Sequence, residues 1–121
     1  MATVYLLGNS ADDGTFKIGV TRGNIEKRIK KLQTGNAEEI YVVMSYETDI
    51  PFLIEKNLHQ RFSNKRMGGE WFKLDSDDIV HFKETCKEIE EMFASLQDAN
   101  NPYITKMLKK ATKIAKLKDN S

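Results

Sequence analysis

The pattern of hydrophobic and polar residues near the start of the chain contains two short apolar segments. The segments VYLL and FKIGVT are apolar and β-branched, and a polar connection containing Gly14 joins them. This pattern predicts a β-hairpin of residues 3–8 and 15–20. The run IYVVMSY at residues 40–46 is strongly apolar and bounded by charged residues, and it predicts a third strand.

Two helices are predicted in the same part of the chain. The first covers residues 25–34, because its apolar residues share one face and Asn24 is suited to the N-cap position. Gly35 is expected to end this helix in the left-handed conformation. The second helix is expected to begin with Asp49 as its N-cap and Pro51 in its first turn.

The last third of the chain is predicted to be helical. One helix, capped by Asp75 or Ser76, carries a single apolar stripe. The stripe consists of Ile79, Phe82, Cys86, Ile89, Phe93 and Leu96. We expect the stripe to cap the sheet of a monomer. The alternative is that the stripe forms a homodimer interface. A final helix, to about Lys118, is predicted to have one apolar side and one lysine-rich side.

The overall composition is that of one soluble domain. A chain of 121 residues is long enough to bury a single core without staples. Cys86 is the only cysteine, so no internal disulfide is possible and a reducing compartment is expected. No apolar run reaches the roughly 20 residues of a membrane span. We therefore expect a cytoplasmic protein that does not interact with membranes.

The net charge of +1 conceals an uneven distribution. Residues 73–100 hold three Lys/Arg against eight Asp/Glu, a net charge of −5, whereas residues 101–121 hold six lysines against Asp119, a net charge of +5. Asymmetry of this kind indicates a charged partner, or two segments that face each other or water.

Five fragments, in order, resemble a known family. They are VYLL, KIG, EKRIKKLQTGN, EKNLHQRF and GGEWFKL. Together they are similar to the GIY-YIG nuclease superfamily, and more narrowly to its bacteriophage-type branch. The resemblance covers about residues 3–75, so residues 1–75 are predicted to form a GIY-YIG-like domain and residues 76–121 a helical extension packed on it. The implied fold class is α+β, a small three-stranded antiparallel sheet flanked by helices.

The resemblance also implies a catalytic site and its metal. Tyr5 matches the first motif tyrosine, Gly19 the motif glycine, and Arg28 the helix arginine. Glu55 matches the ligand of a single Mg²⁺ or Mn²⁺ ion, with phosphate oxygens and water in the other positions. Lys17 stands where many relatives carry the second tyrosine, and we count it among the candidate catalytic residues.

Each of these side chains also has an ordinary structural explanation. Tyr5 either positions or deprotonates the attacking water, with a pKa lowered by a neighbouring cation, or it simply packs in a strand. Lys17 supplies that cation, holds a phosphate, or faces solvent. Arg28 clamps a phosphate or lies on an exposed helix face. Glu55 binds metal or pairs with Arg61.

Three further residues are of interest around this set. His59 follows Glu55 by four residues on one helix face, where it either supports the metal site or packs as a hydrogen-bonded histidine. Glu70 is expected to act as a capping residue or to pair with Arg66. Trp71, with Phe72, is expected to be a core anchor.

Basic residues outside the catalytic set are candidates for binding nucleic acid, since phosphate neutralisation by lysine and arginine is independent of base sequence. These residues are Arg22, Lys27, Lys30, Lys31, Lys109, Lys113 and Lys116.

The sequence thus predicts a magnesium-dependent endonuclease that hydrolyses DNA. The alternative is a GIY-YIG-fold module that binds nucleic acid or protein without cutting, such as a phage regulator or inhibitor.

Overall fold

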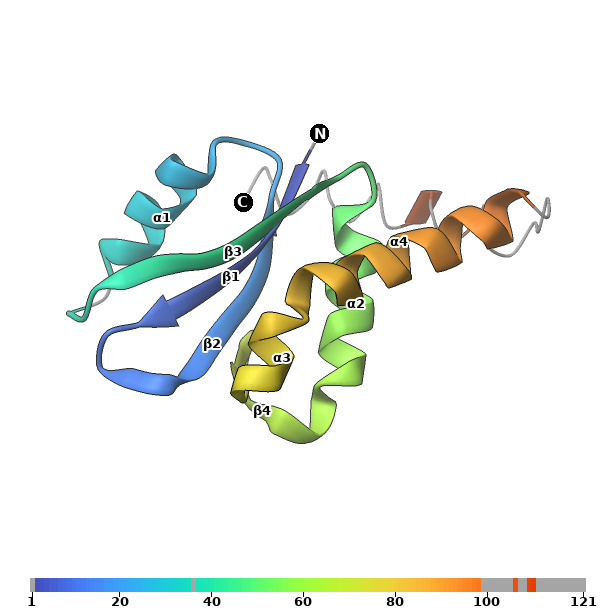
Figure 1. Cartoon of the computed structure of the whole chain (residues 1–121). Helices are drawn as coiled ribbons and strands as arrows, with labels where there is room; N and C mark the ends of the chain where they lie inside the picture. Colours follow the sequence, from blue (N-terminus) through green and yellow to red (C-terminus); the bar gives the residue numbers. More distant parts are fainter. Residues whose placement is uncertain (1, 36, 99–105, 107–108, 111–121) are drawn as a thin grey trace.

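The computed structural model describes residues 2–35, 37–98, 106, 109 and 110 (Figure 1). Five strands, four α-helices and one 3₁₀ helix occur in this part of the chain. In order, they are β1 (Ala2–Asn9), β2 (Asp12–Thr21), α1 (Ile25–Gln33), β3 (Ile40–Thr48), α2 (Pro51–Arg61), η1 (Ser63–Lys65), β4 (Arg66–Gly68), β5 (Trp71–Lys73), α3 (Ser76–Val80) and α4 (Phe82–Asp98).

The strands form a single antiparallel sheet in the order β3-β1-β2-β5-β4. The α+β class and the first three strands agree with the sequence, but the prediction of only three strands is wrong. The two additional strands have three residues each, which is too short for an alternating pattern to be detected. Pairing of Thr15–Lys17 with Trp71–Lys73 adds them to the edge of the hairpin.

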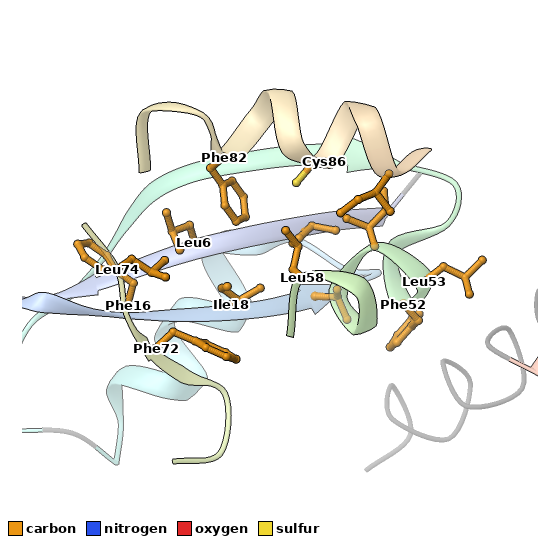
Figure 2. Packing of buried hydrophobic residues seen from close by; sticks show 14 of the residues in the cluster. Leu6, Phe16, Ile18, Phe52, Leu53, Leu58, Phe72, Leu74, Phe82 and Cys86 are labelled. Atoms are coloured by element: carbon orange, nitrogen blue, oxygen red, sulfur yellow. The ribbon is translucent and has the colours of Figure 1, made fainter. Parts of the chain in front are cut away.

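Helices cover both faces of the sheet (Figure 1). Successive side chains of β1 point to opposite faces of the sheet. Both sets are buried, because helices cover both faces. Val4 and Leu6 belong to the larger core beneath α2 and α4, while Tyr5 and Leu7 pack with Ile40 on the face that α1 covers. Figure 2 shows the larger core, in which Leu6 and Ile18 from the sheet lie between side chains of α2 and α4.

The apolar stripe of the last third is used inside the molecule. Phe82, Cys86, Ile89 and Phe93 are buried in the larger core, so this stripe caps the sheet. The predicted single helix is divided in two, because α3 ends at Val80 and His81 separates it from α4. Asp75 is the N-cap of α3, where it forms a reciprocal capping box with Asp78.

The ends of the two other helices differ in how well the sequence predicts them. Asn24 caps α1 as expected, since its side chain accepts hydrogen bonds from the backbone N–H groups of the first turn. The prediction for Asp49 is wrong: Ile50 is the N-cap of α2, and its N–H donates to the Thr48 hydroxyl instead. The prediction for Gly35 is also wrong, because Gly69 is the only described glycine with a positive φ.

Helix α1 is less deeply buried than α2. It has no buried residue, and its apolar side chains are only partly covered where they meet Tyr5 and Leu7. Helix α2, by contrast, has six buried residues, among them Glu55. The final predicted helix lies largely outside the described residues, which include only its helical, exposed Lys106, Lys109 and Lys110. No helix among the described residues is both long and apolar enough to cross a membrane.

Candidate active site

The centre of the candidate site is a tyrosine that lies over a glycine. Tyr5 on β1 is directly opposite Gly19 on β2. A Cβ atom at position 19 would lie 2.5 Å from the Tyr5 hydroxyl oxygen, which is closer than real side chains approach. The phenol ring therefore needs a glycine beneath it. Tyr5 is only 1% exposed, so its hydroxyl is enclosed between the sheet and α1.

Arg28 reaches this hydroxyl from α1. Its Nε donates a hydrogen bond to the Tyr5 oxygen at 3.5 Å, and the side chain is half-buried. Arg28 follows Ile25 by three residues and precedes Leu32 by four, and both pack on the cluster that includes Tyr5, so the helix directs the guanidinium inward. The exposed-face explanation does not apply to Arg28, although it does apply to the neighbouring lysines.

The ionisation of Tyr5 differs from the prediction. Burial raises the pKa of the phenol above its usual value, and the hydrogen bond and charge of Arg28 only partly oppose this effect. The expected net lowering of the Tyr5 pKa is therefore wrong, and the cation beside the phenol is Arg28, not Lys17. A protonated phenol at neutral pH is suited to orienting its neighbours and not to removing a proton from water.

Lys17 lies on the same face of the sheet as Tyr5, two residues along β2 from Gly19. Its Nζ is 3.3 Å from an Oε of Glu70, and it lies 5.8 Å from the centre of the Trp71 ring. The Lys17 side chain is 16% exposed, so it does not simply extend into solvent. Glu70 neither caps a helix nor pairs with Arg66, whose Nε donates to the carbonyl oxygen of Gly69.

Glu70 is the site residue that the sequence reasoning missed. The available signal was its position in the GGEWF fragment, directly before a short strand that joins the sheet beside Lys17. The expectation for Trp71 also needs correction, because its side chain is only half-buried. Phe72, which is fully buried, is the core anchor of that pair.

Glu55 lies in the middle of α2 and is 5% exposed. Its Oε2 is enclosed and accepts no hydrogen bond from the described residues. Glu55 does interact with neighbouring residues in other ways. The negative charges of Glu70 and Glu55 each make a minor contribution to the raised pKa of Tyr5. Pairing of Glu55 with Arg61 at the surface does not fit, since Arg61 is exposed and contacts Asn57.

His59 has a structural position. Its Nε2 donates to the carbonyl oxygen of Ile18 at 3.1 Å, and its ring packs against Phe72 with centroids 4.9 Å apart. Strand β5 pairs with β2 only as far as Lys17. His59 bonds to the next residue of β2, Ile18, just beyond that pairing. This contact fixes α2, and with it Glu55, beside the sheet.

The basic residues predicted to bind nucleic acid lie around this centre or outside the described residues. Arg22, Lys27, Lys30 and Lys31 are exposed on α1 and on the turn that leads to it. Lys109 is exposed and helical, whereas Lys113 and Lys116 are outside the described residues. A cavity of about 290 Å³ lies beside Arg22, where β2 ends and α2 begins, and is also lined by Ala2, Thr48, Asp49 and Pro51.

The donor set fits a magnesium-type ion better than a zinc-type ion. Within the described ranges, no group of three or more His, Cys, Asp or Glu residues could hold a metal. Mg²⁺ is commonly held by one or two carboxylates, with substrate phosphate and water completing its octahedron, whereas structural zinc needs four protein ligands. Glu55 is therefore a suitable ligand for Mg²⁺ or Mn²⁺.

The structure thus places Tyr5 over Gly19 and Arg28 against Tyr5, an arrangement expected of a GIY-YIG-like domain. Comparison with protein families agrees with this class. The chain belongs to the T5orf172 domain family, whose model matches residues 2–93 and so includes most of α4. No curated protein and no solved structure matches the chain.

Proposed function

We propose that this protein is a metal-dependent endonuclease that hydrolyses phosphodiester bonds in DNA. One observation carries the proposal: Arg28, Tyr5 and the Lys17–Glu70 pair are gathered on one face of the sheet, and Glu55 acts on the same phenol from α2. Two cations, a phenol and a buried carboxylate are the groups that bind a phosphodiester and stabilise charge on its oxygens.

Each residue has a distinct role in this proposal. Arg28 presents a planar guanidinium that holds a phosphate through two parallel hydrogen bonds, and this hold tightens as negative charge grows on the phosphate oxygens. Tyr5 fixes the orientation of Arg28 through their hydrogen bond. Because the phenol remains protonated near neutral pH, we assign it to orientation of Arg28 and not to proton removal.

Glu55 would hold the divalent ion. Such an ion polarises a phosphoryl oxygen and lowers the pKa of a bound water. His59 keeps the helix of Glu55 against β2, which fixes where the carboxylate stands relative to Arg28. The exposed Arg22, Lys27, Lys30 and Lys31 are positioned to contact the DNA backbone on the α1 side of this centre.

The decisive experiment replaces Glu55 with Gln and measures plasmid nicking with Mg²⁺ or Mn²⁺. Removing one group that stabilises the transition state costs about a hundredfold or more in rate, and we expect a loss of that size. Glu84→Gln is the matched control, because Glu84 is an exposed carboxylate on α4. Undiminished cutting by the Glu55 variant would remove this residue from the proposal.

The same experiment separates cutting from binding. The complete enclosure of the Tyr5 hydroxyl is the observation that favours a module that binds without cutting. Wild-type protein that shifts DNA in a gel but never cleaves it with any of several divalent metals would establish the binding function. Protein that does neither would point to a protein partner.

A further inference from the structure

The side chain of Lys17 is held in place by two neighbours on β5 and the turn before it. Its ammonium contacts the Glu70 carboxylate at 3.3 Å and the Trp71 ring at 5.8 Å. The backbone of Glu70 is itself fixed, because its carbonyl oxygen accepts a hydrogen bond from the Ile18 N–H at 3.0 Å. Glu70 is therefore anchored to the strand that carries Lys17.

The register of the sheet places this pair next to the proposed phosphate site. Lys17 and Gly19 are two residues apart on β2, so their positions share one face of the sheet. Tyr5 lies over Gly19 and bonds to Arg28. The charge of Glu70 makes a minor contribution to the raised pKa of Tyr5, in keeping with this placement.

We propose that Glu70 is a positioning residue that holds the Lys17 ammonium as the second phosphate-binding cation beside Arg28. The inference rests on the proposed function. An ammonium group has three N–H donors, so the ion pair with Glu70 leaves donors for the oxygens of an incoming phosphate. Glu70 and Trp71 keep the flexible lysine from turning into solvent before DNA arrives.

The test compares Glu70→Gln, Lys17→Met and the exchanged pair Lys17→Glu with Glu70→Lys. A charged hydrogen bond lost in the reactive complex corresponds to about a tenfold decrease in rate or more. We expect Glu70→Gln and Lys17→Met each to lower kcat for DNA cleavage by about this factor, with KM changing less than kcat. The exchanged pair is expected to recover thermal stability but not kcat, and Glu84→Gln to leave both unchanged.

Recovery of kcat by the exchanged pair would overturn the inference, because it would show that the ion pair serves only stability. Unchanged kcat in Glu70→Gln would overturn it as well.

A second readout does not depend on cleavage. Trp71 is the only tryptophan, so its fluorescence reports where the Lys17 ammonium lies. We expect Glu70→Gln and Lys17→Met to change the emission of the DNA-free protein in the same direction. Wild-type protein that neither binds nor cuts DNA would refute the proposed function and with it the phosphate role of Lys17. Unchanged emission in Glu70→Gln would refute the holding of Lys17 by Glu70 even if the wild type cleaves DNA.

Discussion

Two glycines of the sheet lie beneath tyrosine rings, and we expect an added methyl group to have very different effects at the two positions. Gly19 is opposite Tyr5, and Gly8 is opposite Tyr41. A Cβ at either glycine would come within about 2.5 Å of ring atoms. Tyr5 is 1% exposed and enclosed by α1, whereas Tyr41 is 40% exposed and is able to swing aside.

The expected magnitudes follow from this difference. Overpacking a well-filled interior costs about 1–3 kcal/mol, and replacing a strand glycine with alanine recovers about 0.5–1 kcal/mol. Gly19→Ala should therefore lower the free energy of unfolding by about 1–2 kcal/mol. Gly8→Ala should leave it unchanged or raise it by up to about 1 kcal/mol, because the Tyr41 ring moves away.

Urea unfolding of both variants measures these changes. A double-mutant cycle adds Tyr5→Leu, which removes the distal ring atoms, and the cost of Gly19→Ala should then largely disappear. The reasoning would be refuted by equal effects at the two glycines, or by a Gly19→Ala cost that persists after the Tyr5 ring is gone.

Three other predictions concern the scaffold around the site. Asn24→Ala should lower the free energy of unfolding by about 1 kcal/mol, because the N-cap side chain of α1 is lost; circular dichroism in urea measures this, and an unchanged midpoint would contradict it. Phe82→Ala should cost about 3–5 kcal/mol, because this fully buried ring joins α4 to the sheet core; a loss below about 1 kcal/mol in the same assay would show that α4 is dispensable. Burial raises the pKa of the Cys86 thiol from 9.0 to about 12, so the folded protein should hold about a thousandfold less thiolate at pH 8 than an exposed cysteine does. Ellman's reagent should therefore react with Cys86 only after unfolding. The pKa of this thiol is higher in the folded state than in the unfolded state. The stability that the protonated thiol contributes should therefore hold below pH 9 and be lost as the pH rises toward 12.

Much of the fold could be predicted from periodicity, because long elements repeat their pattern several times. The stripe that includes Phe82 and Ile89 has a helical spacing and is buried as expected. Single residues at element ends were harder to predict. Asp49 is an ordinary N-cap residue type, yet Ile50 occupies the N-cap of α2 without a side-chain cap, and the Thr48 hydroxyl accepts the Ile50 N–H in a local turn instead.

For the candidate site, the sequence anticipated part of which side chains lie together, but not their ionisation or the place of Glu70. The order of motifs identified Tyr5 and Arg28, which the structure brings together. The pKa of Tyr5 depends on how deeply the ring is buried, and burial is a property of the assembled fold. Glu70 became visible only through the pairing of β5 with β2, since a three-residue strand gives no pattern of its own.

The unequal attachment of the two helices around the site has a consequence for its motion. Helix α1 has no buried residue, whereas α2 contributes six residues to the interior. The amide protons of α1 should therefore exchange with deuterium well before those of α2, as expected for a separate unit of local opening. Arg28 would be released from Tyr5 in that opening while Glu55 stays in place, so under the proposed function Arg28 is the group that adjusts to an arriving DNA strand.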